Sequence, residues 1–272
     1  MTEKEYRQHP AISRSELWRM HESPEKFKWF KDHPIEPTPS LLFGQVVHKL
    51  LLQPDSFRDE FAVAPVADRR TKAGRELYEE FAATVGERAV VSRDDYDKAL
   101  EMVTAVRMNP LAMKLLRGEK EVPFFWTDEY TGTDCKCRLD CLTEIDGQYY
   151  IVDYKSTGNA ATDIFSNKDV FKYGYHFQAA MYSEGVMHGK ELTERPRFVF
   201  IAQEKTAPYA VNVIAVPDDV MLAGLDTFRE LIGMYHECSV LDSWYGYNGI
   251  LNEMNEVLLP GWMSLGVEED EE

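Results

Sequence analysis

The spacing of apolar and polar residues predicts that the first part of the chain is mostly helical. Residues 40–53 form a largely apolar run, SLLFGQVVHKLLLQ, which predicts a buried helix ended by the proline that follows. Residues 71–85 and 92–108 carry apolar side chains at helical intervals and predict two amphipathic helices. The sequence SRSE at residues 13–16 is a capping box and predicts the start of a short helix. Helices therefore dominate the first 120 residues.

The pattern changes to strands near residue 121. Residues 121–127, 133–145 and 148–155 are rich in aromatic and β-branched side chains, which favour strands. The Asp146-Gly147 pair between the last two predicts a tight turn, and so a hairpin. The remaining elements expected are a helix over residues 174–188, a second hairpin over 197–203 and 210–216, and a helix over 217–236.

This order of elements predicts an α/β (α+β) fold with a central mixed β-sheet flanked by helices. We expect a single domain over residues 1–272. Within it, residues 1–120 form a mostly helical lobe and residues 121–236 form the sheet and its helices. Residues 237–272 form a C-terminal extension with an acidic tail.

Composition narrows the class of protein. The chain is 44% hydrophobic and 28% charged, as in soluble globular proteins, which excludes collagen-like and fully disordered chains. No apolar run approaches the roughly 18 residues of a membrane span, and the N-terminus has no apolar signal region. The four cysteines do not form a disulfide framework. A cytoplasmic protein without a membrane partner is the expectation.

The net charge of −17 argues against a protein that coats DNA, because phosphate binding needs clustered cations. It does not exclude an enzyme that acts on nucleic acid. Such an enzyme needs only a local basic groove, and its metal site needs local carboxylates.

The segment IVDYKST at residues 151–157 combines an acid and a base on one strand. Alternate side chains of a strand share a face, so Asp153 and Lys155 point the same way. The carboxylate can bind a hard divalent ion, and the ammonium can position a water molecule or stabilise charge developing on a phosphate. A surface ion pair on a half-exposed strand is the alternative interpretation.

Asp140 lies on the preceding strand, at nearly the same distance from the turn as Asp153. The two residues are therefore candidate cross-strand neighbours. Two close carboxylates repel each other unless a cation neutralises them, and a divalent metal ion is the natural cation.

Two helical segments add polar residues at one-turn spacing. Gly44 and His48 lie on one face of an otherwise apolar helix, where His48 is either a metal ligand or a hydrogen-bonded core histidine. Gln178 and Tyr182 also share a helical face, which by itself is compatible with a partly exposed helix.

The order of these motifs, GxxxH, a strand acid, D-x-K and QxxxY, resembles the PD-(D/E)xK nuclease superfamily. It is most similar to the branch that contains the RecB nuclease domain and exonuclease VIII (RecE). The similarity continues through AIS at residues 11–13 with Ser15 and Leu17, LQP at 52–54 and FVF at 198–200, and spans about residues 10–230 in collinear order.

The resemblance implies a role for each matching position. The implied metal ligands are His48, Asp140, Asp153 and the backbone carbonyl of Tyr154. Lys155 orients or deprotonates the attacking water, while Gln178 and Tyr182 line the site and touch the DNA backbone. This ligand set favours Mg²⁺ or Mn²⁺. Glu121 either adds a carboxylate or is a plain acid on an edge strand.

The segment RRTK at residues 69–72 is the most basic stretch of the chain. Cations oppose the dipole at a helix start, so phosphate capture by Arg69, Arg70, Thr71 and Lys72 explains the placement better than a solvated helix start does. Arg138, which precedes the strand acid within the resembling motif, is a further candidate DNA contact.

The resemblance implies a magnesium-dependent exonuclease of phage or prophage type that acts 5′ to 3′ on linear double-stranded DNA ends. Its 3′ tails would serve a single-strand annealing protein of the RecT type, and the enzyme would form a homo-oligomeric ring. The alternatives are a Cas4-like or structure-specific endonuclease, a non-catalytic DNA-binding module and a hydrolase of small phosphoesters. No iron–sulfur cluster is expected, because relatives that hold one need a cysteine before the histidine motif and this chain has none before Cys135.

Overall fold

A computed structural model describes residues 1, 3–33 and 38–259. Its centre is one mixed β-sheet in the order β1-β5-β6-β7-β8, with β4 paired to the other edge of β5. The strands are β1 (Ile12–Ser13), β4 (Glu119–Thr127), β5 (Asp134–Ile145), β6 (Gln148–Thr157), β7 (Arg197–Glu204) and β8 (Val211–Ala215). β1 pairs in parallel with β5, and β7 pairs in parallel with β6. The other pairs of this sheet are antiparallel. The mixed sheet and the hairpin at Asp146-Gly147 confirm the prediction.

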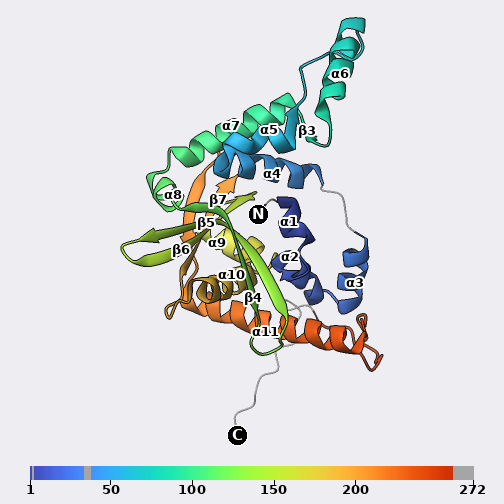
Figure 1. Cartoon of the computed structure of the whole chain (residues 1–272), viewed down its shortest axis with the longest axis vertical. Helices are drawn as coiled ribbons and strands as arrows, with labels where there is room; N and C mark the ends of the chain where they lie inside the picture. Colours follow the sequence, from blue (N-terminus) through green and yellow to red (C-terminus); the bar gives the residue numbers. More distant parts are fainter. Residues whose placement is uncertain (2, 34–37, 260–272) are drawn as a thin grey trace.

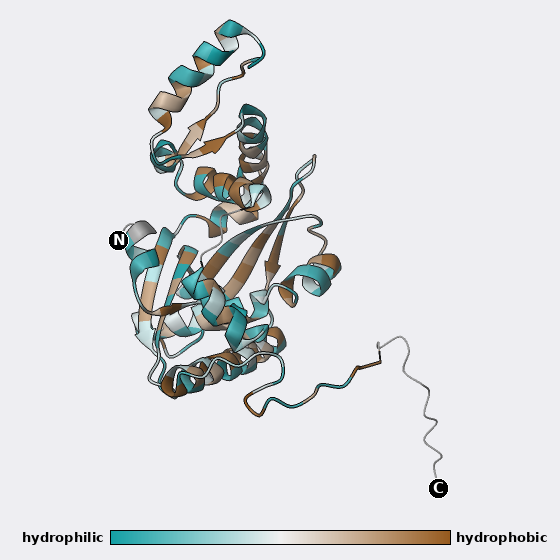
Figure 2. Ribbon diagram, turned by 90° about the vertical axis from the view of Figure 1, so that its right-hand side faces the viewer, coloured by the Kyte–Doolittle hydropathy of each residue, from teal (hydrophilic) through white to brown (hydrophobic). Residues whose placement is uncertain are grey.

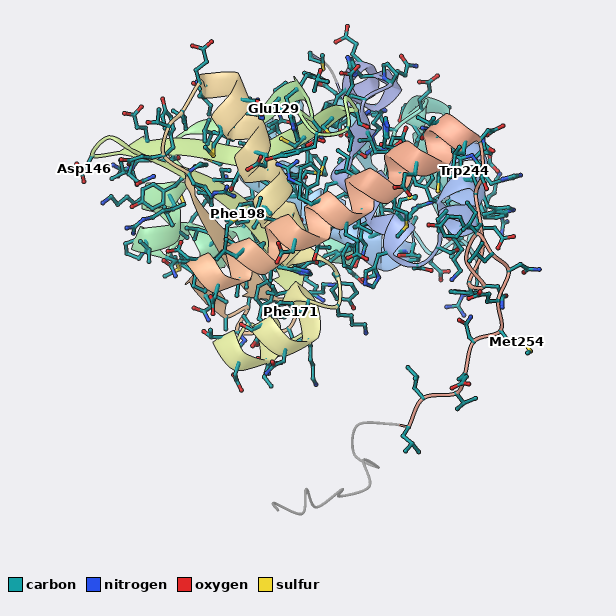
Figure 3. All side chains as sticks on the ribbon, turned by 90° about the horizontal axis from the view of Figure 1, so that it is seen from below. Glu129, Asp146, Phe171, Phe198, Trp244 and Met254 are labelled. Carbon is teal, nitrogen blue, oxygen red and sulfur yellow. The ribbon has the colours of Figure 1, made fainter. Side chains whose placement is uncertain are left out.

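Helices cover both faces of the sheet (Figure 1). On one face, α10 (Tyr175–Lys190) and α11 (Asp218–Leu241) close a core with side chains of β4, β5, β6 and β7. On the other face, α4 (Pro39–Leu52), α7 (Arg93–Arg107) and α8 (Pro110–Leu115) close a second core. Figure 3 shows α11 crossing the whole of the first face. Burial on both faces explains why β7 is apolar along nearly its whole length.

Short elements complete the chain. They are α1 (Glu3–Gln8), α2 (Arg14–Leu17), η1 (Trp18–His21), α3 (Pro24–Asp32), η2 (Pro54–Ser56), α5 (Phe57–Glu60), α9 (Thr162–Phe165) and a π-helical turn, η3 (Ser166–Val170). The predicted capping box is present: the Glu16 carboxylate accepts a hydrogen bond from the Ser13 backbone N–H at 2.9 Å. No helix in the described part of the chain is both long and apolar enough to cross a membrane.

One arm projects from the body of the molecule. Strands β2 (Phe61–Val63) and β3 (Ala89–Val91) form a separate parallel pair, and α6 (Lys72–Val85) connects them. Only Gly74 is buried along α6, which stands away from the main sheet in both views (Figures 1 and 2). The acidic tail expected at the C-terminus lies outside the described residues.

Candidate active site

Two neighbouring strands separate at the point where their carboxylates lie. The pairing of β5 with β6 ends at Cys141 and Val152, and the next residue on each strand is Asp140 or Asp153. The exposed fractions of these two side chains are 14% and 3%. Asp140 Oδ2 accepts a hydrogen bond of 2.8 Å from the Tyr154 backbone N–H. The structure therefore places the two acids as cross-strand neighbours, as the distances from the turn predicted.

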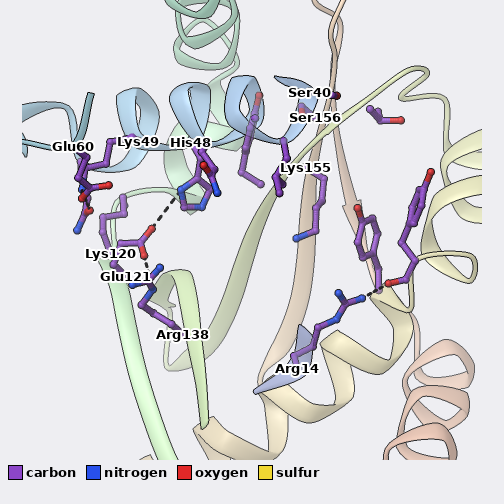
Figure 4. Close-up of a pocket in the computed structure, with 18 of the residues that line it drawn as sticks. Arg14, Ser40, His48, Lys49, Glu60, Lys120, Glu121, Arg138, Lys155 and Ser156 are labelled. Carbon is purple, nitrogen blue, oxygen red and sulfur yellow. Dashed lines mark hydrogen bonds and ion pairs between the residues drawn. The ribbon is translucent and has the colours of Figure 1, made fainter. Parts of the chain in front are cut away.

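His48, Glu121 and Asp140 form a three-residue cluster, which we call the candidate metal centre. Helix α4 carries His48 over the end of the paired strands, where its Nε2 lies 2.9 Å from Asp140 Oδ1. Its Nδ1 lies 3.5 Å from Glu121 Oε1 (Figure 4). One potential ligand atom from each residue lies within 4.8 Å of the others. An imidazole nitrogen and two carboxylates suit a divalent ion such as Mn²⁺ or Mg²⁺.

Glu121 reaches this cluster through an unusual backbone conformation. On β4, Lys120 pairs with Cys141 and Val122 pairs with Leu139, so Glu121 stands opposite Asp140 where the ladder is interrupted. Its φ of 54° lies in the left-handed region, which is rare for a residue with a side chain. Arg138 Nε holds the second carboxylate oxygen at 2.8 Å. Glu121 is thus a member of the cluster and not a plain edge-strand acid.

Asp153 belongs to a second, adjoining group. Its Oδ2 lies 2.6 Å from Lys155 Nζ, and its Oδ1 accepts a hydrogen bond from the side-chain amide of Gln178 on α10. Gln178 is 3% exposed, so it holds the carboxylate in place and does not face open solvent. The D-x-K motif and the first residue of QxxxY therefore meet in one hydrogen-bonded unit beside the candidate metal centre.

The protonation of these groups follows from burial and from their neighbours. Burial opposes a charge on His48, but Asp140 and Glu121 outweigh it and raise the pKa of His48 to about 9. Burial raises the pKa of Glu121 to about 7 and that of Asp153 to about 6. For Lys155, burial is outweighed by Asp153, and the pKa is raised. Without a metal ion, the imidazolium supplies the cation that the carboxylates require.

A cavity of about 1150 Å³ opens in front of both groups. His48, Glu121 and Lys155 line it directly, while Asp140 and Asp153 each contact one of these lining residues. The cations along its wall, in a chain of net charge −17, are Arg7, Arg14, Lys49, Lys120, Arg138, Lys155 and Lys205. A basic cavity beside a carboxylate cluster suits a phosphodiester backbone.

Several predicted positions lie elsewhere or make other contacts. None of Arg69, Arg70, Thr71 and Lys72 lines this cavity, because all four lie at the start of the projecting arm. Thr71 is the N-cap of α6, and its side chain accepts a hydrogen bond from Gly74 N. Tyr182 packs against the core beside Phe198 and is not among the lining residues. For Tyr154 the observed contact is the backbone N–H to Asp140; the carbonyl role stays a prediction.

Arg14 is a lining residue that sequence reasoning missed. It begins α2, directly after the capping-box serine, and lies between Ser13 and Ser15, two of the positions that carried the resemblance. Nothing in the spacing of the motifs marks it, because β1 brings it to the site only through pairing with β5. The four cysteines, Cys135, Cys137, Cys141 and Cys238, are buried and free.

A family model described as a PDDEXK-like domain of unknown function (DUF3799) matches residues 13–256. The chain belongs to this family. A solved structure from Eubacterium rectale, provisionally named an exonuclease, is similar over 96% of this chain and 95% of that one, with 17% identity and a TM-score of 0.61. The structure of SSO0001 covers 67% of this PDDEXK-like chain and 74% of its own, at 13% identity and a TM-score of 0.27. A search of curated proteins found no match.

Proposed function

We propose that this PDDEXK-like protein is a metal-dependent deoxyribonuclease that cleaves linear double-stranded DNA from its ends. The observation that carries the proposal is the pairing of the His48–Glu121–Asp140 cluster with the Asp153–Lys155–Gln178 unit at one basic cavity. Such a cavity attracts a polyanion. The clustered acids need a cation, and phosphodiester hydrolysis by this superfamily also needs one, in the form of a metal ion.

His48, Glu121 and Asp140 are the residues that would hold Mg²⁺ or Mn²⁺, and Asp153 adjoins them. A divalent ion supplies an activated water and charge stabilisation for the leaving oxygen. Binding requires His48 to be neutral and to release Asp140, which it contacts at 2.9 Å. One imidazole and two carboxylates, which together require a positive charge, fit such an ion.

Lys155 acts in this proposal as a cation and a hydrogen-bond donor. Its raised pKa keeps the amine protonated at neutral pH, so it orients water or a phosphate oxygen and does not accept a proton. Asp153 fixes the ammonium at 2.6 Å, and Gln178 fixes Asp153. The chain thereby holds its one catalytic lysine in a single position facing the cavity.

Direction and partners are further parts of the proposal. Cleavage in the 5′ to 3′ direction, with 3′ tails passed to a RecT-type annealing protein, follows from the resemblance to exonuclease VIII. We also propose a homo-oligomeric ring, in which the basic residues at the start of the α6 arm contact the DNA outside the cavity. The side chain of Arg70 is 94% exposed, and its one ion pair among the described residues is with the exposed Asp68, at 3.3 Å.

The test uses linear duplexes labelled separately at each 5′ and 3′ end, incubated with the full chain and Mg²⁺ or Mn²⁺. Release of 5′-terminal label first, with closed circular DNA intact, is the expected result. Cutting of the closed circle would instead indicate an endonuclease. Absence of cleavage with either metal on any DNA would remove the nuclease proposal.

Asp153→Asn and Asp134→Asn form a matched pair on adjacent strands. Asp153→Asn should lower activity by at least about 1000-fold, because Lys155 loses its anchor and the site loses a charge. Asp134 is exposed at the start of β5 and bonds only to Thr127 among described residues. Its variant should keep wild-type activity, and a similar loss in both would contradict the assignment.

A further inference from the structure

Arg14 and Lys155 contact the same aromatic ring in the cavity. The Arg14 guanidinium carbon lies 5.7 Å from the centroid of the Tyr175 ring, and Lys155 Nζ lies 4.9 Å from that centroid. Arg14 itself lines the cavity wall (Figure 4). A second cation therefore stands one side chain away from the group proposed to act on the cleaved phosphate.

The guanidinium of Arg14 has donors to spare. Its Nη2 donates to the backbone carbonyl of Tyr173, and its Nε is buried without a hydrogen-bond partner. In the described part of the chain it forms no ion pair; the charge of Asp153 acts on it, but Asp153 is held by Lys155. Its Nη1 is not enclosed by the protein and forms no hydrogen bond in the described part of the chain, so this donor is available to a phosphate in the cavity.

Aromatic side chains fix the position of this cation. Trp18 and Phe177 lie 5.8 and 6.0 Å from the guanidinium carbon, in addition to Tyr175. Contacts with aromatic faces hold a guanidinium in one orientation while leaving its edge free for hydrogen bonds. The planar fork of an arginine matches two oxygens of a phosphate group.

We propose that Arg14 binds a phosphate of the DNA next to the phosphate that is cleaved. This subsite rests on the proposed nuclease function. The ligand is a phosphate monoanion or dianion, supplied either by an internal backbone linkage or by a phosphorylated strand end. It sets how far the strand enters the cavity, and so which linkage lies beside Lys155.

The experiment combines protein variants with modified DNA. Arg14→Gln is compared with Arg19→Gln, a control arginine from the same segment that stacks on Phe30 at 4.4 Å and does not line the cavity. The duplexes carry one neutral methylphosphonate linkage at successive positions from the end, or a 5′-hydroxyl in place of a 5′-phosphate. Initial rates give kcat/KM for each pair of protein and substrate.

Arg14→Gln should lower kcat/KM on unmodified DNA by about 10- to 100-fold, the usual effect of losing a charge-assisted hydrogen bond. One modification should lower the wild-type rate equally but leave Arg14→Gln unaffected. A methylphosphonate in that role identifies an internal linkage, and the 5′-hydroxyl identifies a strand end. Equal sensitivity of wild type and Arg14→Gln to every modification would overturn the subsite.

A binding measurement tests the subsite even if the wild type or a variant does not cleave DNA. In Ca²⁺, the log–log salt dependence of duplex affinity should flatten by about 0.9 in Arg14→Gln and stay unchanged in Arg19→Gln. Arg14→Lys keeps the charge and should restore the slope but not the bidentate affinity. An unchanged slope in Arg14→Gln would defeat the subsite even if the nuclease proposal had failed separately.

Discussion

The proton on His48 should compete directly with a metal ion. The pKa of His48 is raised to about 9 because the nearby acids outweigh the effect of burial. A metal ion binds only the neutral imidazole, so protonation must be reversed before His48 can become a ligand. At about pH 7 only about one molecule in a hundred has that form.

The size of the effect follows from this difference of about two pH units. The dissociation constant for Mn²⁺ should fall about tenfold per pH unit from pH 7 to 9, about 100-fold in all, and then level off. Glu121, with a pKa raised to about 7 mainly by burial, adds a second competing proton below that pH. The dependence should therefore steepen on the acidic side.

Free Mn²⁺ can be measured by electron paramagnetic resonance under argon, at pH 7, 8 and 9. Calorimetry in two buffers of different ionisation enthalpy then counts the protons released, and we expect about one per ion at pH 7 to 8. His48→Gln provides the control, because a neutral side chain leaves little pH dependence in this range. A wild-type dissociation constant that is the same at pH 7 and pH 9 would refute the reasoning.

Three further predictions concern stability. Gly224→Ala should lower the free energy of unfolding by about 3 kcal/mol, because the new Cβ would lie 2.2 Å from the His176 carbonyl oxygen. Gly233→Ala, in open space on the same helix, should raise the free energy of unfolding by about 1 kcal/mol. Urea denaturation of both variants measures the two effects. Arg229→Ala should lower the free energy of unfolding, measured in urea, by about 3 kcal/mol, because it leaves Asp128, which is 2% exposed, without its ion pair. If the effects of Arg229→Ala and Asp128→Asn simply add in the double variant, the two residues do not stabilise each other. Burial lowers the pKa of His176, so as pH falls the unfolded chain binds that proton before the folded chain does. The contribution of His176 to stability is therefore complete above about pH 6.5 and is lost as pH falls below it. In thermal denaturation, a His176→Gln variant should lose less stability than the wild type over this acidic range.

Strong local signals explain the part of the fold that sequence could predict. The apolar run of α4 and the Asp146-Gly147 turn act within a few residues, so their elements form where the pattern places them. The same turn sets the register of β5 and β6, and that register places Asp140 beside Asp153. The order of the motifs along the chain then predicted that His48 belongs to the same site.

Elements that depend on tertiary pairing gave no such signal. β1 and β2 are two and three residues long, too short for any period, and form only because β5 and β3 offer parallel edges. The left-handed conformation of Glu121 depends on its position opposite Asp140, which no local pattern encodes. The RRTK segment has a strong charge signal, but the geometry of the arm separates it from the cavity.

The backbone of Glu121 sets two selective pressures against each other. A φ of 54° costs a residue with a side chain about 1 kcal/mol, a cost that glycine avoids. A library of variants at this codon selected for heat resistance of the metal-free protein should therefore enrich glycine. The same library selected for DNA degradation should keep glutamate, because its carboxylate is the group that this position contributes to the candidate metal centre, 3.5 Å from His48 Nδ1. Divergence between the two enriched pools would reveal a position that natural selection maintains against the stability of the chain.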